Sequence, residues 1–155
     1  NLQSKTTIAI LGDSHAEQYF GGVVDAAWRL GFRVLLLTKP SCPAPDVNIF
    51  LYHEQRPYPE CVKFHAAAMA KLLEVKPALV IASSMVTQSV IDPDTDAVAN
   101  HDRGATNAIC SVQGCFPIRA SSIVVRDNTH ISRTYSHVLG MLWRVILQRE
   151  LPKIH

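Results

Sequence analysis

A serine flanked by glycine, aspartate and histidine stands near the N-terminus, between two stretches of regular structure. The run Gly12-Asp13-Ser14-His15 follows a short apolar stretch and precedes a helical pattern. Where a buried parallel strand gives way to a helix, backbone N–H groups and the positive end of the helix dipole meet at the ligand-binding edge of the sheet. Because such donors stabilise an oxyanion, Ser14 is a candidate nucleophile for acyl transfer.

Two simpler interpretations of this junction stay open. Asp13 or Ser14 can cap the helix by accepting a backbone N–H. A helix N-terminus can also bind phosphate without any catalysis, as in flavodoxin-like loops. Ser14 alone does not decide between these interpretations.

A carboxylate and a histidine stand three residues apart near the C-terminus, in the run Asp127-Asn128-Thr129-His130. Asp127 can accept the Nδ1–H of His130, which fixes the tautomer and supports the imidazolium that forms when Nε2 takes the serine proton. Taken alone, this spacing fits a helix-entry turn with an incidental histidine. Its occurrence together with Ser14, each after a strand, favours Asp127 and His130 as the base of a serine nucleophile.

The elements that must position these residues alternate between strand and helix, which indicates an α/β fold. Apolar runs and helical periodicity predict strands over 6–11, 33–37 and 78–82 and helices over 16–30 and 61–75. Gly31 stands where a C-cap glycine belongs, and Pro77 stops the second helix. The apolar positions predicted for that second helix are Val62, His65, Ala66, Met69, Leu72 and Leu73.

The C-terminal part predicts a short strand over 122–125 and a helix that opens at Ser132. Its apolar face comprises Tyr135, Val138, Leu139, Leu142, Trp143 and Ile146, with Trp143 expected in the core. The stretch 86–114 is polar and has no crossover helix, so it is either a long functional loop or a sign of a missing or disordered segment near 84–92. We expect one domain over 1–155, with a polar lead-in over 1–5.

Composition excludes several kinds of partner. The formal net charge is +2 and the basic residues are scattered, so nucleic acid is not expected. No apolar stretch reaches the roughly 18 to 20 residues needed to span a bilayer, and no signal-peptide layout is present. We therefore expect a soluble piece whose parent protein carries any membrane part.

Four cysteines form an even set without a CxxC pair, which argues against a zinc site. Of the three possible pairings, Cys42 with Cys61 and Cys110 with Cys115 would close two short loops, and the first bridge would staple the proline-rich stretch 38–59. This pairing implies an oxidising compartment. Four unrelated buried thiols in a cytosolic protein remain the alternative.

These residues together resemble the SGNH (GDSL-like) hydrolase superfamily. The start Gly12-Asp13-Ser14-His15-Ala16, the Ser41-Cys42-Pro43 loop with Cys61, the Cys110 and Cys115 pair and the finish Arg126-Asp127-x-x-His130-Ile-Ser132 are similar to the SGNH domain fused to bacterial acyltransferase-3 membrane proteins. The resemblance covers both ends and the middle of the chain.

The resemblance implies a three-layer α/β/α sandwich with a central, mainly parallel sheet, on the extracytoplasmic side of the membrane and tethered through the parent protein. It implies O-acylation, usually O-acetylation, of a cell-envelope glycan in partnership with a membrane acyltransferase domain of the same parent chain. Ser14 would be the acylated nucleophile, His130 the base and then the acid, and Asp127 its orienter. An acyl donor and a carbohydrate acceptor are implied, and no metal or organic cofactor.

The chain departs from the family pattern after the third strand. Ser83, Ser84 and Met85 stand where typical members carry an oxyanion-donating asparagine, although members fused to acyltransferases often lack it. The oxyanion site then rests on the Ser14 N–H, with Asp13, His15 and Ser84 as further candidates for the pocket.

Two other functions are compatible with the same residues. Hydrolysis of acyl esters by the same triad is an alternative, as is a non-catalytic module that binds glycans or docks to a partner. His15 is a candidate for the mouth of the pocket. We expect surface or interface positions, and no metal set, for His53, His65, His101, His137 and His155.

Overall fold

The structure is a computed structural model of the 155-residue chain. It describes residues 3–85, 89–91, 95–96, 98–100, 110–111, 114–115, 118–119, 122–123, 136–137 and 139–151.

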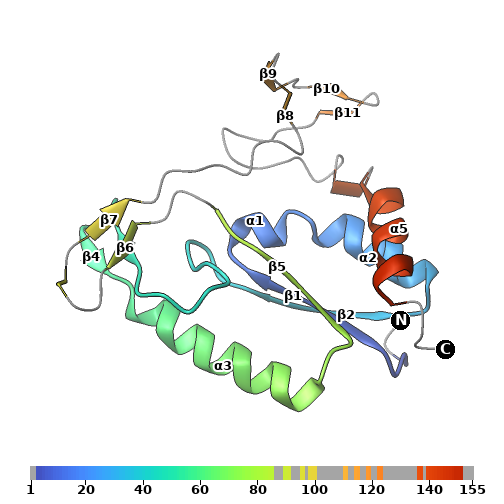
Figure 1. The fold of residues 1–155 in the computed structure, drawn as a ribbon, viewed down its shortest axis with the longest axis horizontal. Helices are drawn as coiled ribbons and strands as arrows, with labels where there is room; N and C mark the ends of the chain where they lie inside the picture. The colour runs from blue at the N-terminus through green and yellow to red at the C-terminus, as the bar shows by residue number, and fades with distance from the viewer. Residues whose placement is uncertain are drawn as a thin grey trace.

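A three-stranded parallel sheet forms the centre of the fold (Figure 1). Strand β1 (Thr7–Gly12) lies between β2 (Arg33–Thr38) and β5 (Leu79–Ser83), and it pairs with both in parallel. A central parallel strand is covered on both faces, which explains why β1 is apolar almost throughout. Helices flank this sheet, so the predicted α/β class is confirmed, while the complete three-layer sandwich stays a prediction.

The first crossover contains two helices where the sequence predicts one over 16–30. Helix α1 (Ser14–Glu17) ends before Gln18, and α2 (Phe20–Arg29) begins after Tyr19. The break lies just before Gly21 and Gly22, residues with low helix propensity, whereas the apolar spacing runs through it. Gly31 has a φ of +75° and ends this crossover as predicted.

The second crossover runs from β2 to β5 through the long helix α3 (Pro59–Val75). Lys76 adopts a left-handed conformation at its C-terminus, and Pro77 follows. A small hairpin of β3 (Phe50–Leu51) and β4 (Arg56–Pro57) precedes α3, within a stretch that the sequence predicts as irregular.

The predicted apolar face of α3 is wrong in part. The buried positions are Cys61, His65 and Ala68, which recur at helical spacing toward the sheet. Val62, Met69 and Leu73 are exposed. Helix α3 has two apolar stripes side by side. Both recur at helical spacing, so the sequence pattern predicts a single apolar face that includes residues of each stripe.

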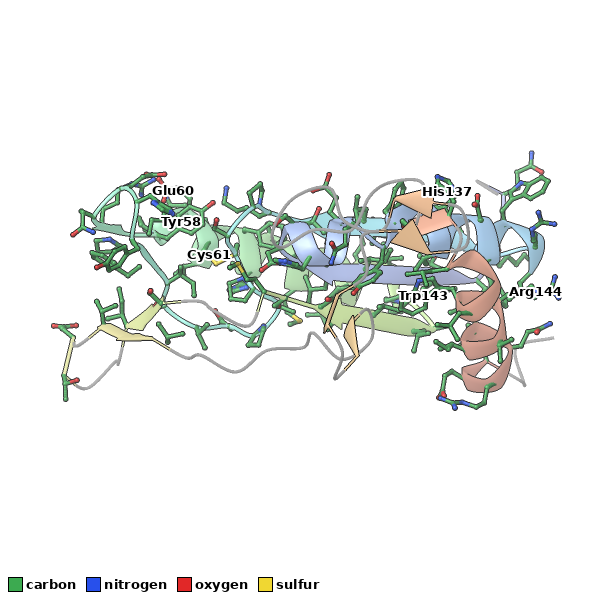
Figure 2. All side chains as sticks on the ribbon, turned by 90° about the horizontal axis from the view of Figure 1, so that it is seen from above. Tyr58, Glu60, Cys61, His137, Trp143 and Arg144 are labelled. Carbon is green, nitrogen blue, oxygen red and sulfur yellow. A yellow bond between two sulfur atoms is a disulfide. The ribbon has the colours of Figure 1, made fainter. Side chains whose placement is uncertain are left out.

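The core lies between the sheet and the pair α2 and α5 (Gly140–Glu150). Ile8 and Ile10 of β1 are fully buried there. Trp143 packs against both groups of core residues and lies between α5 and the strands, which confirms its expected place (Figure 2). Leu142, predicted on the same face, is exposed instead. The buried leucine of α5 is Leu147, which lies on a different side of the helix from Leu142.

Helix α2 lies close to the chain that precedes α5, and the point of closest approach is Gly22. The Gly22 N–H donates to the Ser136 hydroxyl over 3.2 Å, and a Cβ at Gly22 would collide with the Ser136 carbonyl oxygen. This contact joins segments 114 residues apart in the sequence and requires the absence of a side chain at Gly22.

The region after β5 contains short antiparallel pairs. Strands β6 (Ser89–Ile91) and β7 (Val98–Asn100) form one pair, and β6 is bridged to Ile49, next to β3. The sequence did not predict this pair, because its three-residue strands lie among polar residues.

Further pairs occur later in the chain. They comprise β8 (Cys110–Ser111) with β9 (Gly114–Cys115), and β10 (Ile118–Arg119) with β11 (Ser122–Ile123). The sequence predicts a strand over 122–125 that ends at the same sheet edge as Ser14. That expectation is wrong for its described half, since Ser122 and Ile123 pair antiparallel with β10 and stay outside the parallel sheet. Only two residues separate β10 from β11, so closing the turn between them costs little entropy, which favours this local pairing.

Within the described part of the chain, none of the helices is long and apolar enough to cross a membrane.

Gly12 is the residue whose substitution should disturb this fold most directly. Its φ is +145°, and a Cβ there would overlap the Ser83 carbonyl oxygen. We expect Gly12→Ala to lower the free energy of unfolding by more than about 3 kcal/mol, because backbone strain and overlap act together. Gly31→Ala is the control, since nothing lies near its Cβ and only a strain of about 1–2 kcal/mol applies. Equal losses in urea denaturation would contradict this account.

The Cys42–Cys61 disulfide gives a second prediction for stability. The bridge joins residues 19 apart. Replacing both cysteines with alanine should lower the free energy of unfolding by about 3 kcal/mol, because the unfolded chain regains the entropy of that loop. Denaturation of the wild type and of the double variant, both without reductant, checks the value, because a Cys110–Cys115 bridge is then the same in both proteins.

Candidate functional site

The candidate site lies at the carboxyl edge of the parallel sheet, where β1, β2 and β5 end together. In the strand register Gly12 is opposite Thr38 on one side and Ser83 on the other. Ser14 follows as the first residue of α1, as the sequence predicts. This is the edge of an open α/β sheet at which ligands bind.

Asp13 is the N-cap of α1 and is almost completely buried. Its Oδ1 accepts the His15 N–H over 2.8 Å, and its Oδ2 accepts the Met85 N–H over 2.7 Å. Its main-chain carbonyl also accepts the Ala16 and Glu17 N–H groups, over 3.0 and 3.1 Å. One residue therefore caps the helix and ties it to the chain that leaves β5, so the capping interpretation holds for Asp13.

The environment of Asp13 keeps its carboxyl group ionised. Burial is the largest single influence and opposes ionisation, but the hydrogen bonds from His15 and from the Met85 and His15 backbone outweigh it, and the pKa of Asp13 lies below its ordinary value. A buried carboxylate with two N–H donors is a fixed negative charge at the start of α1.

Ser14 stands half-buried at this terminus, and its carbonyl accepts the Gln18 N–H over 3.1 Å. The N–H groups of His15, Ala16 and Glu17 all donate to Asp13. These three N–H groups are therefore not available to an oxyanion at Ser14. The oxyanion would depend on the Ser14 N–H, which is the donor expected from the sequence, and on groups beyond α1.

The imidazole of His15 lies against Asp13, with Nδ1 3.6 Å from Oδ1. Its side chain is mostly buried. The ring thus covers the Asp13 carboxylate from the side of α1, next to Ser14.

The loop after β2 is anchored to the same edge by two hydrogen bonds. The Lys39 N–H donates to the Gly12 carbonyl over 3.0 Å, and the Ala44 N–H donates to the Ser84 hydroxyl over 2.7 Å. Ser84, a candidate for the pocket, therefore holds the loop with its oxygen.

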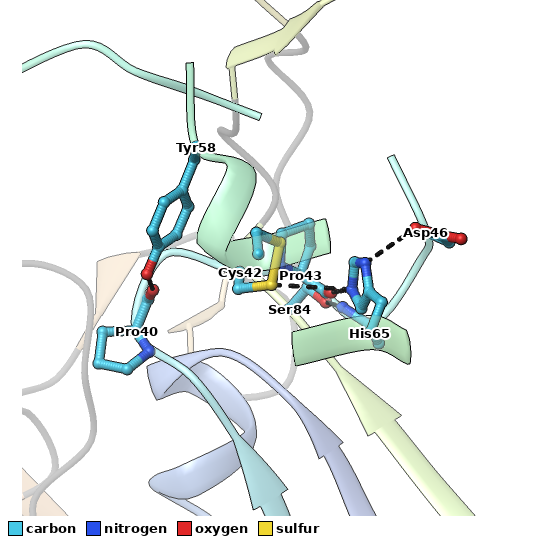
Figure 3. The surroundings of a disulfide bond; sticks show 9 residues. Pro40, Cys42, Pro43, Asp46, Tyr58, His65 and Ser84 are labelled. Carbon is cyan, nitrogen blue, oxygen red and sulfur yellow. Dashed lines mark hydrogen bonds and ion pairs between the residues drawn. A yellow bond between two sulfur atoms is a disulfide. The ribbon is translucent and has the colours of Figure 1, made fainter. Parts of the chain in front are cut away.

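The Cys42–Cys61 disulfide fixes the far side of this loop and confirms the predicted pairing (Figure 3). Beside it, the imidazole of His65 lies 3.0 Å from the Asp46 carboxylate through Nδ1 and 2.7 Å from the Pro43 carbonyl through Nε2. The expected surface position of His65 is wrong, because this residue is buried and links α3 to the loop. The inclusion of His65 among the apolar positions of this helix is confirmed.

Cys42, Cys61 and His65 are also the described residues that come closest to a metal-ligand set, with ligand atoms within 4.8 Å of one another. The two sulfur atoms are bonded to each other, so they are not available as thiolate ligands. This cluster is a structural anchor.

Asp127 and His130 lie outside the described residues, as do His101 and His155. Their predicted roles and positions therefore stay predictions. Cys110 and Cys115 are opposite each other in the backbone register of β8 and β9, while their side chains lie outside the described part. His53 and His137 are exposed, as expected.

The two hydrogen bonds of the Asp13 carboxylate give a testable prediction. Asp13→Asn should lower the free energy of unfolding at neutral pH by about 2–4 kcal/mol, because the amide removes the charge and turns a donor toward one of the two N–H groups. Since the pKa of Asp13 is lowered in the folded state, its stabilisation is present above the ordinary Asp pKa and is lost as pH falls below about 4.

Urea denaturation between pH 7 and pH 3 measures both effects. The difference between wild type and Asp13→Asn should shrink toward pH 3. The exposed carboxylate of Asp25 supplies the control, and Asp25→Asn should change stability by less than about 1 kcal/mol. A constant difference at all pH values would show that Asp13 does not act as a carboxylate.

The sequence was compared with known proteins, solved structures and protein families. No curated protein and no solved structure matches it. A protein-family model described as "SGNH domain (fused to AT3 domains)" matches residues 1–108, which is more than half of the chain and includes the whole parallel sheet and the Ser14 junction. The chain therefore belongs to the family of SGNH domains that are fused to AT3 domains.

Proposed function

We propose that this domain transfers an acyl group, in particular acetyl, to a hydroxyl of a cell-envelope glycan through a Ser14 acyl-enzyme. Membership of the family implies a role in acyl modification. The observation that carries the proposal is the place of Ser14, on the first turn of α1 at the carboxyl end of the central strand, with Asp13 fixing the junction.

The chemistry would run in two steps. The Ser14 Oγ attacks the carbonyl carbon of the acyl donor while His130 takes the hydroxyl proton and Asp127 holds the imidazolium. The tetrahedral oxyanion collapses, the bond to the leaving group breaks, and His130 returns the proton to that group. The acceptor hydroxyl then attacks the acyl-serine and loses its proton to His130, the bond from the acyl carbon to the Ser14 oxygen breaks, and His130 returns the proton to Ser14.

The rigidity of the junction supports a nucleophile more than a flexible binding loop. Gly12 lies so close to the Ser83 carbonyl that a Cβ would not fit, and Asp13 holds the His15 N–H after Ser14 and the Met85 N–H after β5. A serine held in one geometry at a helix N-terminus loses little entropy on reaching the transition state.

The proposal also includes a cellular location and a membrane partner for the domain. We propose an extracytoplasmic location, because the disulfide indicates an oxidising compartment. We also propose a membrane acyltransferase domain in the same parent chain as the source of acyl groups, since the family is described as fused to AT3 domains. The proposal requires the chain that follows β11 to bring Asp127 and His130 to the Ser14 edge.

An acylation experiment tests the proposed nucleophile. The protein is incubated with p-nitrophenyl acetate, and p-nitrophenol release and intact mass are measured. Wild type should release p-nitrophenol and carry one acetyl group. Ser14→Ala and His130→Ala should each lower the rate by about a thousandfold or more, because the triad acts as a unit.

Ser41→Ala is the matched control, because Ser41 is exposed in the loop after β2 and has no role in the proposed steps. It should react at the wild-type rate. Equal acetylation of wild type and Ser14→Ala would overturn the proposal. Product analysis with an added oligosaccharide then separates transfer from hydrolysis, since the acyl group appears on the sugar in the first case and as free acetate in the second.

A further inference from the structure

Helix α3 carries an apolar stripe that faces away from its own sheet. The stripe consists of Val62, Ala66, Met69 and Leu73, which recur at intervals of four, three and four residues. All four are exposed, with Val62 at 45%, Met69 at 55% and Leu73 at 68%. The neighbouring stripe of α3, through Cys61, His65 and Ala68, already packs inward. Figure 1 shows α3 on the side of the sheet away from α2 and α5.

We propose that this stripe is a self-association surface, on which α3 of one copy packs antiparallel against α3 of a second copy about a two-fold axis. A two-fold interface must be self-complementary, so each residue of the stripe must meet a suitable residue of the same stripe. An exposed stripe with apolar residues at helical intervals is the form that helix pairing requires.

The stripe meets this condition when it is reversed on itself. An axis midway between Ala66 and Met69 sets Val62 against Leu73 of the second copy, and Ala66 against Met69. Each contact then combines a larger with a smaller side chain, which fills space without overlap. Both contacts occur twice, because the axis repeats them.

The charges beside the stripe fit the same register. Lys63 and Glu74 are exposed and lie on one flank of the stripe, near its opposite ends. Reversal brings Lys63 of each copy close to Glu74 of the other, so two ion pairs of opposite sign form at the rim. In a parallel two-fold pair the same flank of the two helices lies on opposite sides of the interface, so Lys63 and Glu74 would form no such pairs. Glu74 accepts from Lys71 of its own helix through Oε1, which leaves its second oxygen for the partner.

The pairing should be weak, because one helix face buries less surface than the roughly 1,200 Å² of a standard interface. Sedimentation equilibrium of the full chain with its disulfide intact measures it directly. We expect a reversible monomer–dimer equilibrium with a dissociation constant of about 10–500 μM.

Substitutions test the surface and the register separately. Met69→Lys should weaken dimerisation by about tenfold or more, and it should leave folding intact because Met69 is exposed. Val145→Lys is the matched control, since Val145 is an equally exposed apolar residue (62%) on α5, and it should not alter the equilibrium. Lys63→Glu or Glu74→Lys alone should weaken the dimer several-fold, and the two changes together should restore it.

Three outcomes would overturn the proposal. These are a protein that stays monomeric up to millimolar concentration, a dimer that Met69→Lys leaves unchanged, and a charge-swapped double variant that fails to recover. The circular dichroism spectrum of each variant shows whether it has folded. Because no step depends on Ser14, the acetylation experiment and this one can fail independently.

Discussion

The carboxylate of Asp13 is the interaction on which the rest of the site depends. It receives N–H groups from two places far apart in the sequence, the first turn of α1 and the chain that leaves β5. It can do so only because Gly12, directly before it, allows β1 to lie against the Ser83 carbonyl. Together these two residues bring the ends of two strands and the start of a helix to one point, and Ser14 stands there.

This arrangement has a consequence for the chemistry of the helix terminus. A helix N-terminus usually offers several N–H groups to an anion, but Asp13 takes those of His15, Ala16 and Glu17. The terminus is therefore better suited to present a side chain than to hold phosphate.

A second anchor keeps the opposite side of the sheet edge in place. The Cys42–Cys61 bridge and His65 fasten the loop after β2 to α3, and the hydrogen bond from Ala44 to Ser84 fastens the same loop to the end of β5. Helix α3 thus uses one stripe for this anchor and for the sheet, and it leaves a second apolar stripe exposed. Its two sides have separate structural tasks.

The sequence by itself determined the strand–helix alternation, the parallel sheet and the position of Ser14 at a strand end, because each follows from local spacing. It left the cysteine pairing open, and the folded structure decided for Cys42 with Cys61. Periodicity cannot tell which of two apolar stripes faces inward, so the exposed side of α3 and the burial of His65 were decided by tertiary packing. The pairing of β6 with β7, beside Ile49, also depended on it. The link from Asp13 to Met85 joins residues 72 apart, and only the folded sheet brings a carboxylate and an N–H from such distant positions to one edge.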